Sequence, residues 1–251
     1  MKTSKLVRIT PIENDSLRYD IEVEHSHNFF ADGILVHNSN CQIIFLPNHH
    51  EMTPEIHEEM LFIDNALVDE DDVSSGFFAV ASKGLGAQGL CFKFNEANKN
   101  NVYLQVTRER FSNIARSFCD YKVPVVILGE VYGSGIQDLA YGCKQGEIGF
   151  RVFDIYVGFR GRGRFLNDDE LDDYCNVMGI ERVPILYRGP FNKEKLLELT
   201  QQAKSVFDPN QISEGAVIKP VVERFDPVLG RVAVKMINEA YYLRKGGTEH
   251  N

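Results

Sequence analysis

Four side chains near the start of the chain are suited to cutting and rejoining a peptide bond. The amide of Asn38 can attack its own backbone carbonyl, which closes a five-membered succinimide and breaks the bond to Ser39. The neighbouring His37 can protonate the leaving group, and His27, ten residues earlier, can act as a second acid or base across a hairpin. The Ser39 hydroxyl can accept an acyl group as an ester and return it to its own freed amine.

Two extended segments, at residues 19–23 and 29–36, are expected to position these groups. The second contains the turn signal Ala-Asp-Gly. His-Asn-Ser alone is a common tripeptide, but the whole stretch resembles the C-terminal splicing blocks of an intein. The shared features are a Tyr-Asp-Ile segment, then His-Asn-Phe, then an apolar run that ends in His37-Asn38.

This resemblance covers residues 1–39 and makes Ser39 the first residue of the spliced product. It implies an all-β, Hint-type fold in which Asn38 cyclises, His37 and His27 assist, and Asp20 tunes the same site. A whole intein is several times longer, and its N-terminal half supplies the first nucleophile and a Thr-x-x-His motif. Only 38 residues precede Ser39, and they contain neither feature.

Residues 1–38 are therefore expected to be the C-terminal fragment of a split intein, with Met1 as a genuine start and a separately encoded partner chain. Two alternatives stay open. The segment is a piece cut from a contiguous intein, or it is a decayed remnant, against which the intact His37-Asn38-Ser39 argues.

A second group of chemically useful side chains follows Ser39. Carboxylates, an aromatic ring and lysines recur where strands are expected to end: in GEVYG, FRVFDI, SEGAVIKP and AVKMI. Taken alone, each of these side chains is explained as a surface charge or as an aromatic ring of the core. Together they supply what nucleotidyl transfer needs, namely carboxylates for magnesium, a ring for the base and ammonium groups for phosphate.

Residues 39–251 resemble the nucleotidyltransferase domain of an ATP-dependent RNA ligase of the nick-sealing kind, in which an OB-fold domain comes first. Ser39-Asn40 resembles the tail of the K-x-x-G-(S/T)-N adenylation motif. The resemblance implies ATP and Mg²⁺ as cofactors, with Glu130 and Glu214 as metal ligands. It implies nucleotide-binding roles for Asn40, Lys83, Glu130, Phe150 (stacked on the base), Val217 (beneath the adenine), Lys219 and Lys235.

Two departures from the ligase pattern stand out. Ile237 replaces the second lysine of a K-x-K pair found in many relatives, which puts that phosphate contact in doubt. The adenylated lysine is missing altogether, because the family motif places it just upstream of Ser39. The isolated chain is therefore predicted to be inactive as a ligase until trans-splicing supplies that lysine.

The expected product is an RNA ligase that seals 5′-phosphate and 3′-hydroxyl ends in RNA repair or a related pathway. DNA ligases and capping-type nucleotidyltransferases share the fold and are alternatives, as is an RNA-binding pseudoenzyme. The expected fold class is α+β, with mixed, mainly antiparallel sheets. Helices are expected at residues 109–119, 168–178 and 193–206.

Composition describes an ordinary globular chain of 251 residues, 43% hydrophobic and 25% charged. The net charge of -9 is uneven, because residues 73–167 carry twelve Lys and Arg against seven Asp and Glu. Such a basic centre suits a phosphate-bearing ligand. Five cysteines without metal or disulfide spacing fit a reducing cytoplasm, and no secretory or membrane segment is expected.

Two segments resemble familiar motifs, but the residues around them do not fit the sites that those motifs mark. HEMTP places Pro54 where a zinc protease needs its second histidine, so His49, His50 and His57 are expected in a surface loop. The spacing of Gly84, Gly86 and Gly89 matches G-x-G-x-x-G, but the following LCFKF alternates like a strand, whereas a dinucleotide site needs a helix there.

Overall fold

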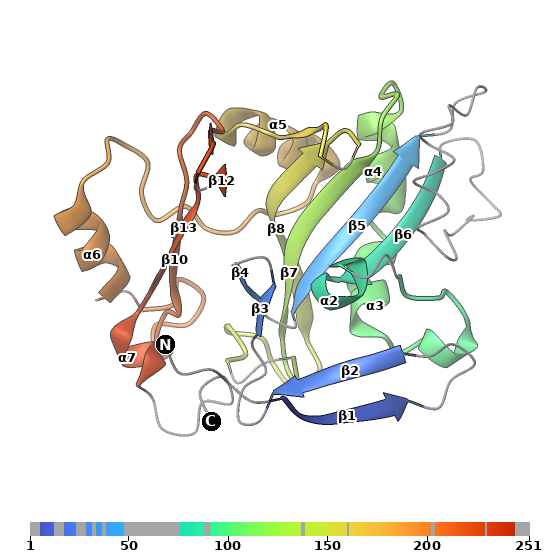
Figure 1. Cartoon of the computed structure of the whole chain (residues 1–251), viewed down its shortest axis with the longest axis horizontal. Helices are drawn as coiled ribbons and strands as arrows, with labels where there is room; N and C mark the ends of the chain where they lie inside the picture. Colours follow the sequence, from blue (N-terminus) through green and yellow to red (C-terminus); the bar gives the residue numbers. More distant parts are fainter. Residues whose placement is uncertain are drawn as a thin grey trace.

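The computed structural model describes residues 39–47, 76–87, 91–136, 139–159, 161–201, 204–228 and 230–243, and the strands at 6–12, 18–23, 29–31 and 34–36. Its centre is a five-stranded antiparallel sheet in the order β6-β5-β7-β8-β9 (Figure 1). The strands are β5 (Asn40–Pro47), β6 (Gly76–Ser82), β7 (Val125–Gly133), β8 (Ile148–Val157) and β9 (Arg164–Phe165).

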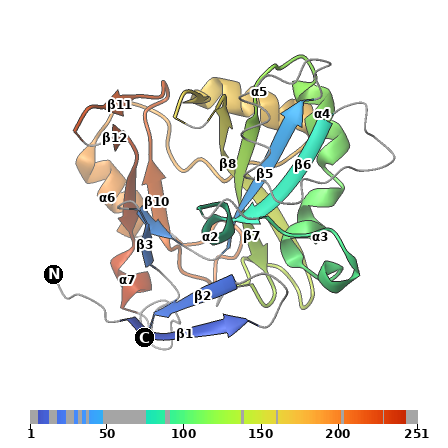
Figure 2. The same cartoon turned by 45° about the vertical axis from the view of Figure 1, so that its right-hand side comes forward.

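Helices cover this sheet because its strands carry alternating apolar side chains. Burial alternates along β7, and Ile43, Ile127 and Ile155 on three adjacent strands are 0% exposed. The helices that share the core of the sheet are α3 (Val102–Arg108), α4 (Phe111–Phe118) and α5 (Asp168–Met178), and the short helix α2 (Lys83–Ala87) also contacts β5 and β6. Figure 2 shows α3 and α4 beside β6.

A smaller unit follows in the sequence and lies beside the large sheet (Figure 1). It consists of a two-stranded sheet, β10 (Gly215–Ile218) with β13 (Val234–Ile237), contacted by α6 (Lys193–Gln201). The chain between β10 and β13 forms a second small pair, β11 (Phe225–Asp226) with β12 (Gly230–Arg231), and α7 (Glu239–Tyr242) comes last.

Four strands precede Ser39. Antiparallel pairs form between β1 (Leu6–Ile12) and β2 (Arg18–Val23), and between β3 (Phe29–Ala31) and β4 (Ile34–Val36). The two predicted extended segments are confirmed as β2 and as the β3–β4 pair. The Hint-type arrangement stays a prediction.

The mixed α+β class with a mainly antiparallel sheet is confirmed, as are the α5 helix and its stop at Gly179, whose φ is 65°. Two local predictions were wrong, and one helix was not predicted. The helix without a prediction is α3. The α6 helix ends at Gln201 rather than at residue 206, and β7 continues through the GEVYG motif to Gly133. Glu130 therefore lies within a strand and not at its end.

The predicted strand over LCFKF is also absent. Residues 91–94 belong to no strand, although the Phe92 amide donates to the Val80 carbonyl oxygen of β6 at 2.8 Å. The alternation has another cause, because Phe92 stacks on Tyr103 and Phe94 packs against Phe111. The helix α2 (Lys83–Ala87) contains Gly84 and Gly86 rather than following them, so the geometry does not match a dinucleotide-binding loop.

In the part of the chain that the structure describes, no helix has both the length and the apolar character needed to cross a membrane.

Candidate functional site

The best-defined polar cluster joins the start of β5 to the middle of β7. Asn40 and Glu130 are paired across the two strands, which places their side chains together. The Ser39 hydroxyl donates to Glu130 Oε1, and Asn40 Nδ2 donates to Glu130 Oε2 at 2.7 Å. The Val131 amide donates to the Ser39 carbonyl oxygen at 2.9 Å, and Ser39 is only 3% exposed. Both oxygens of the Glu130 carboxylate are thus held in place.

Two lysines share the electrostatic environment of this cluster. Lys83 follows β6 directly, and Ser82 pairs with Cys41 next to Asn40. Burial lowers the pKa of Lys83, the charge of Glu130 opposes that shift, and Lys235 on β13 lowers the pKa further. An anion such as a phosphate would relieve the repulsion between the two ammonium groups. The structure therefore brings Asn40, Lys83, Glu130 and Lys235 together from three strands and a helix start.

The ring of Phe150 occupies the place where a side chain at position 129 would project. A Cβ on Gly129 would lie 2.4 Å from Phe150 Cε2, so only glycine fits there. Phe150 is 3% exposed, belongs to the core cluster, and has the Arg110 guanidinium 5.9 Å from its ring centroid. The ring thus packs against the strand that carries Glu130, while its stacking on a base stays a prediction.

The second predicted metal ligand, Glu214, is held by a residue that sequence reasoning missed. The Tyr141 hydroxyl donates to Glu214 Oε1, and the Tyr141 amide donates to Gln211 Oε1 at 3.1 Å. Tyr141 has a φ of 50°, an unusual backbone conformation for a residue other than glycine. Its ring stands edge-on to Tyr132 and Phe207, at 6.2 and 6.4 Å between centroids. No motif or spacing marks Tyr141 in the sequence.

Lys219 forms an ion pair within the protein. Its ammonium group contacts the Asp154 carboxylate and donates to the Phe153 carbonyl oxygen at 3.1 Å. Asp154 also accepts two hydrogen bonds from Arg231, at 2.8 and 3.0 Å, and Arg231 in turn binds Glu223. This network connects β8 to the smaller unit. Asp154 belongs to the FDI part of a motif that the sequence analysis used only for its aromatic residue.

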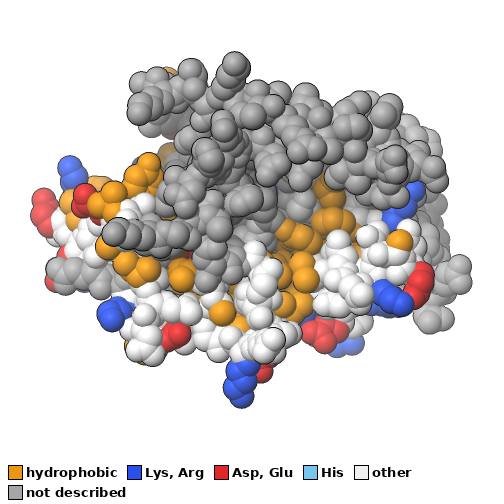
Figure 3. All heavy atoms as spheres, turned by 90° about the horizontal axis from the view of Figure 1, so that it is seen from below, with side chains coloured by type: hydrophobic (Ala, Val, Ile, Leu, Met, Phe, Trp, Pro, Cys, Tyr) orange, Lys and Arg blue, Asp and Glu red, His pale blue; other side chains and the backbone are white. Residues whose placement is uncertain are grey.

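Val217 and Lys235 are paired in the β10–β13 sheet, and Val217 is 62% exposed. Figure 3 shows that hydrophobic side chains gather toward the middle of one face, with most of the charged ones near its rim. The predicted contact of Val217 with an adenine ring is untested.

The remaining splicing residues fall outside this description. His27, His37 and Asn38 are not among the described residues, and neither are His49, His50 and His57. Asp20 lies in β2, opposite Thr10.

The predicted metal ligands suit magnesium in their chemistry. Mg²⁺ is commonly bound by one or two carboxylates together with substrate phosphates and water, and Glu130 and Glu214 offer two carboxylates. Among the described residues no group of three or more His, Cys, Asp or Glu side chains is placed to hold a metal by itself.

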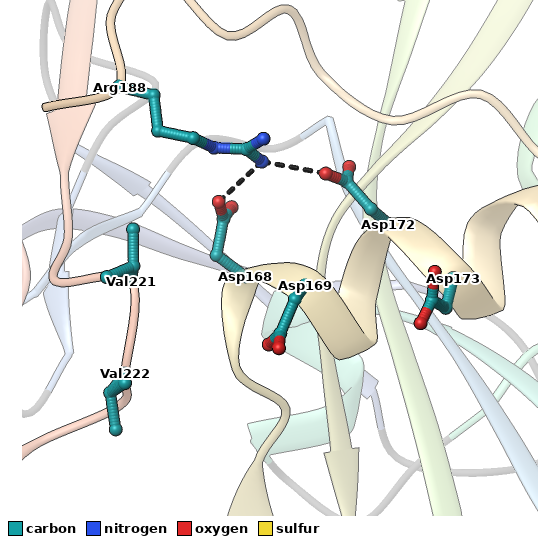
Figure 4. A pocket seen from close by; sticks show the side chains of 7 residues that line it. All are labelled: Asp168, Asp169, Asp172, Asp173, Arg188, Val221 and Val222. Atoms are coloured by element: carbon teal, nitrogen blue, oxygen red, sulfur yellow. Dashed lines mark hydrogen bonds and ion pairs between the residues drawn. The ribbon is translucent and has the colours of Figure 1, made fainter.

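A separate cavity of about 370 Å³ lies at the start of α5. Figure 4 shows Arg188 between the carboxylates of Asp168 and Asp172, at 2.5 and 2.7 Å. Arg182 binds the same two carboxylates, so this acidic group is neutralised internally. The cavity is lined by Asp168, Asp169, Asp172, Asp173, Arg188, Val221 and Val222 and contains none of the predicted site residues.

The fold resembles solved RNA ligase structures. A Naegleria gruberi RNA ligase mutant with ATP and Mn matches with a TM-score of 0.50 and 16% identity over 82% of this chain and 49% of that chain. A second mutant of that ligase, in its apo form, gives 0.50 and 17% over 82% and 49%. This chain thus spans about half the length of those ligases.

Two curated proteins match a short stretch. Protein RecA of Mycobacterium gastri is 57% identical over 37 residues, and Protein RecA of Mycolicibacterium thermoresistibile is 54% identical over 33 residues. These matches cover 9% and 8% of the two RecA proteins.

The family model described as RNA ligase matches residues 36–237, which is most of the chain. Its match begins next to Ser39, includes the whole Ser39–Asn40–Glu130 cluster and ends with β13. The chain therefore belongs to the RNA ligase family.

Proposed function

We propose that this chain is a precursor that splices in trans with a separately encoded partner, and that the spliced product is an ATP-dependent RNA ligase. The observation that carries the proposal is that Ser39 belongs both to the predicted splicing residues and to the ligase cluster. It directly follows His37-Asn38, the pair suited to breaking the backbone, and its hydroxyl is bound to Glu130 in the ligase cluster. The junction thus falls within the ligase site itself.

The ligase half of the proposal rests on family membership and on the charges in the cluster. The amine of the partner's lysine attacks the α-phosphate of ATP and pyrophosphate leaves. The RNA 5′-phosphate then attacks this lysine-linked AMP and releases the lysine, and attack by a 3′-hydroxyl expels AMP and seals the strand. Lys83 and Lys235 bind phosphate groups in these steps, which relieves their mutual repulsion. A divalent metal held by Glu130 and Glu214 supplies charge stabilisation at the phosphates.

The splicing half rests on the residues around the junction. Asn38 cyclises and releases the chain that begins with Ser39, after Ser39 has taken the acyl group of the partner as an ester. The paired strands β1–β2 and β3–β4 are the kind of β structure that such a fragment needs.

The ligase proposal is tested with ATP labelled at the α-phosphate. Lys83, Lys219 and Lys235 are charge partners and are ill placed for in-line attack, so the isolated chain should acquire no label, with or without magnesium. After mixing with the partner, label should appear only on the spliced product, at a lysine a few residues before Ser39. Label on this chain alone that is lost when one of those three lysines is replaced by alanine would show that the assignment is wrong.

The splicing proposal is tested by mass spectrometry of mixed halves. The Asn38→Ala variant should stop at a branched ester, because no other residue at the junction can form the succinimide. Ser39→Ala should give no joined product, although cleavage can continue. A normal yield of joined ligase from either variant would contradict the proposal.

A further inference from the structure

The residue proposed as the splicing nucleophile is hydrogen-bonded to a carboxylate of the ligase cluster. Ser39 Oγ donates to Glu130 Oε1, while Asn40 Nδ2 holds Oε2 at 2.7 Å. A hydroxyl, an acceptor for its hydrogen and a third group that orients the acceptor together form the arrangement that activates serine nucleophiles in enzymes. The motifs assigned Ser39 to splicing and to the tail of the adenylation motif, and they gave Glu130 no role in splicing.

We infer that Glu130 is a catalytic residue of splicing as well as a member of the ligase cluster, its carboxylate orienting and polarising the Ser39 hydroxyl. The inference rests on the proposed splicing function. In the step concerned, Ser39 Oγ bonds to the acyl carbon of the partner's thioester or ester. The bond from that carbon to the partner's sulfur or oxygen breaks, and the hydroxyl proton ends on the departing atom as a thiol or alcohol.

The backbone around Ser39 fits this role. The Val131 amide donates to the Ser39 carbonyl oxygen at 2.9 Å, directly beside Glu130 in β7, so nucleophile and acceptor are fixed by the same pair of strands. Ser39 is 3% exposed, so its hydroxyl is held inside the protein next to Glu130.

Splicing then depends on a folded ligase sheet. Glu130 lies 91 residues beyond Ser39 and reaches it only when β5 and β7 are paired. An intein fragment fused to an unrelated sequence beginning with Ser would lack this carboxylate. The folded ligase half thus supplies a residue that acts in the splicing of its own precursor.

The test uses the full chain and a synthetic peptide thioester ending in glycine as the acyl donor. Neutral hydroxylamine then removes acyl groups from cysteines such as the exposed Cys119, whereas an oxygen ester on Ser39 survives and is located by tandem mass spectrometry. Glu130→Ala should lower the rate of Ser39 acylation by at least about tenfold. Glu130→Gln keeps an acceptor oxygen and should fall between that variant and the wild type.

Controls separate chemistry from folding. Ser39→Ala sets the background, and Glu96→Ala, which removes a carboxylate whose side chain is 82% exposed, should react as the wild type does. Circular dichroism identifies variants that keep the fold. If Glu130→Ala does not fold, the rate of Ser39 acylation in Glu130→Gln is the test of the inference.

Two outcomes overturn the inference: a folded wild-type chain whose Ser39 takes no acyl group, or a folded Glu130→Ala variant that reacts at the wild-type rate or faster. The probe needs neither the partner nor ATP. If acylation depends on Glu130 but chain and partner give no joined product, the proposed splicing is contradicted while the action of Glu130 on Ser39 stands.

Discussion

Glu130 and Glu214 come from similar sequence motifs but lie in different kinds of structure. Glu130 is in the middle of β7, with β5 on one side and β8 on the other, and strand neighbours such as Ile127 are 0% exposed. Glu214 precedes β10 in a two-stranded sheet, where Val217 is 62% exposed. Hydrogen bonds from Ser39 and Asn40, at the start of the neighbouring strand β5, hold the first carboxylate, whereas Tyr141 from a loop holds the second.

Those polar contacts are few and specific. Tyr141 binds Glu214, and Asp154 on β8 binds both Lys219 and Arg231 of the smaller unit. The comparison therefore indicates that the large sheet presents a preformed half of the site. The smaller unit is positioned against it by several hydrogen bonds and a group of ion pairs, and three substitutions test this difference.

The largest effect is expected from Glu214→Ala in the spliced enzyme. Removing a carboxylate proposed to hold the metal should lower adenylation and nick sealing by more than about a hundredfold, while the yield of trans-splicing stays normal. Glu239→Ala, which removes an exposed carboxylate at the start of α7, is the matched control. A Glu214→Ala ligase that seals nicked RNA at the normal rate would exclude Glu214 from the site.

An intermediate effect is expected from Asp154→Ala. The carboxylate is 6% exposed, and its loss leaves Lys219 and Arg231 without their shared partner. Breaking such a pair costs about 3 kcal/mol of unfolding free energy, and about 2 kcal/mol here because both cations are about a fifth exposed. Urea unfolding measures the loss. Glu181→Ala breaks an ion pair to a 71% exposed carboxylate and should cost less than about 1 kcal/mol. Equal losses in the two variants would contradict the role of Asp154.

The smallest effect is a pH dependence within the large unit. Two hydrogen bonds from Arg164 lower the pKa of Glu170 from 4.5 to about 2. Because the folded-state pKa is depressed, this stabilisation is complete above about pH 4.5 and is lost as the pH falls through about 2. Arg164 is 57% exposed, so the effect is about 1 kcal/mol or less.

The free energies of unfolding of Glu170→Gln and wild type should therefore converge as the pH falls from 5 to 2. Glu198→Gln on α6 is the control. A constant difference between the Glu170→Gln and wild-type curves across that range would show that Arg164 does not act through the charge of Glu170.

Local sequence patterns predicted the helices and strands whose geometry depends on residues close together in the sequence. Apolar spacing predicted a helix at residues 168–178, which is α5, and the FRVFDI, SEGAVIKP and AVKMI motifs were expected in strands, which are β8, β10 and β13. The same patterns gave a wrong strand over LCFKF, because alternation there reflects packing of Phe92 and Phe94 on helix residues rather than a ladder. Alternation alone does not distinguish these two causes.

What the sequence determined by itself is the chemistry available at each position: an amide, an imidazole and a hydroxyl in a row at 37–39, and carboxylates and lysines in ligase-like motifs. Only the tertiary structure decided which of these groups meet. Ser39 binds Glu130 because β5 pairs with β7, Glu214 is held by Tyr141 from a loop 73 residues earlier, and Lys219 is engaged by Asp154. Such contacts depend on the pairing and packing of segments far apart in the chain, which no local spacing encodes.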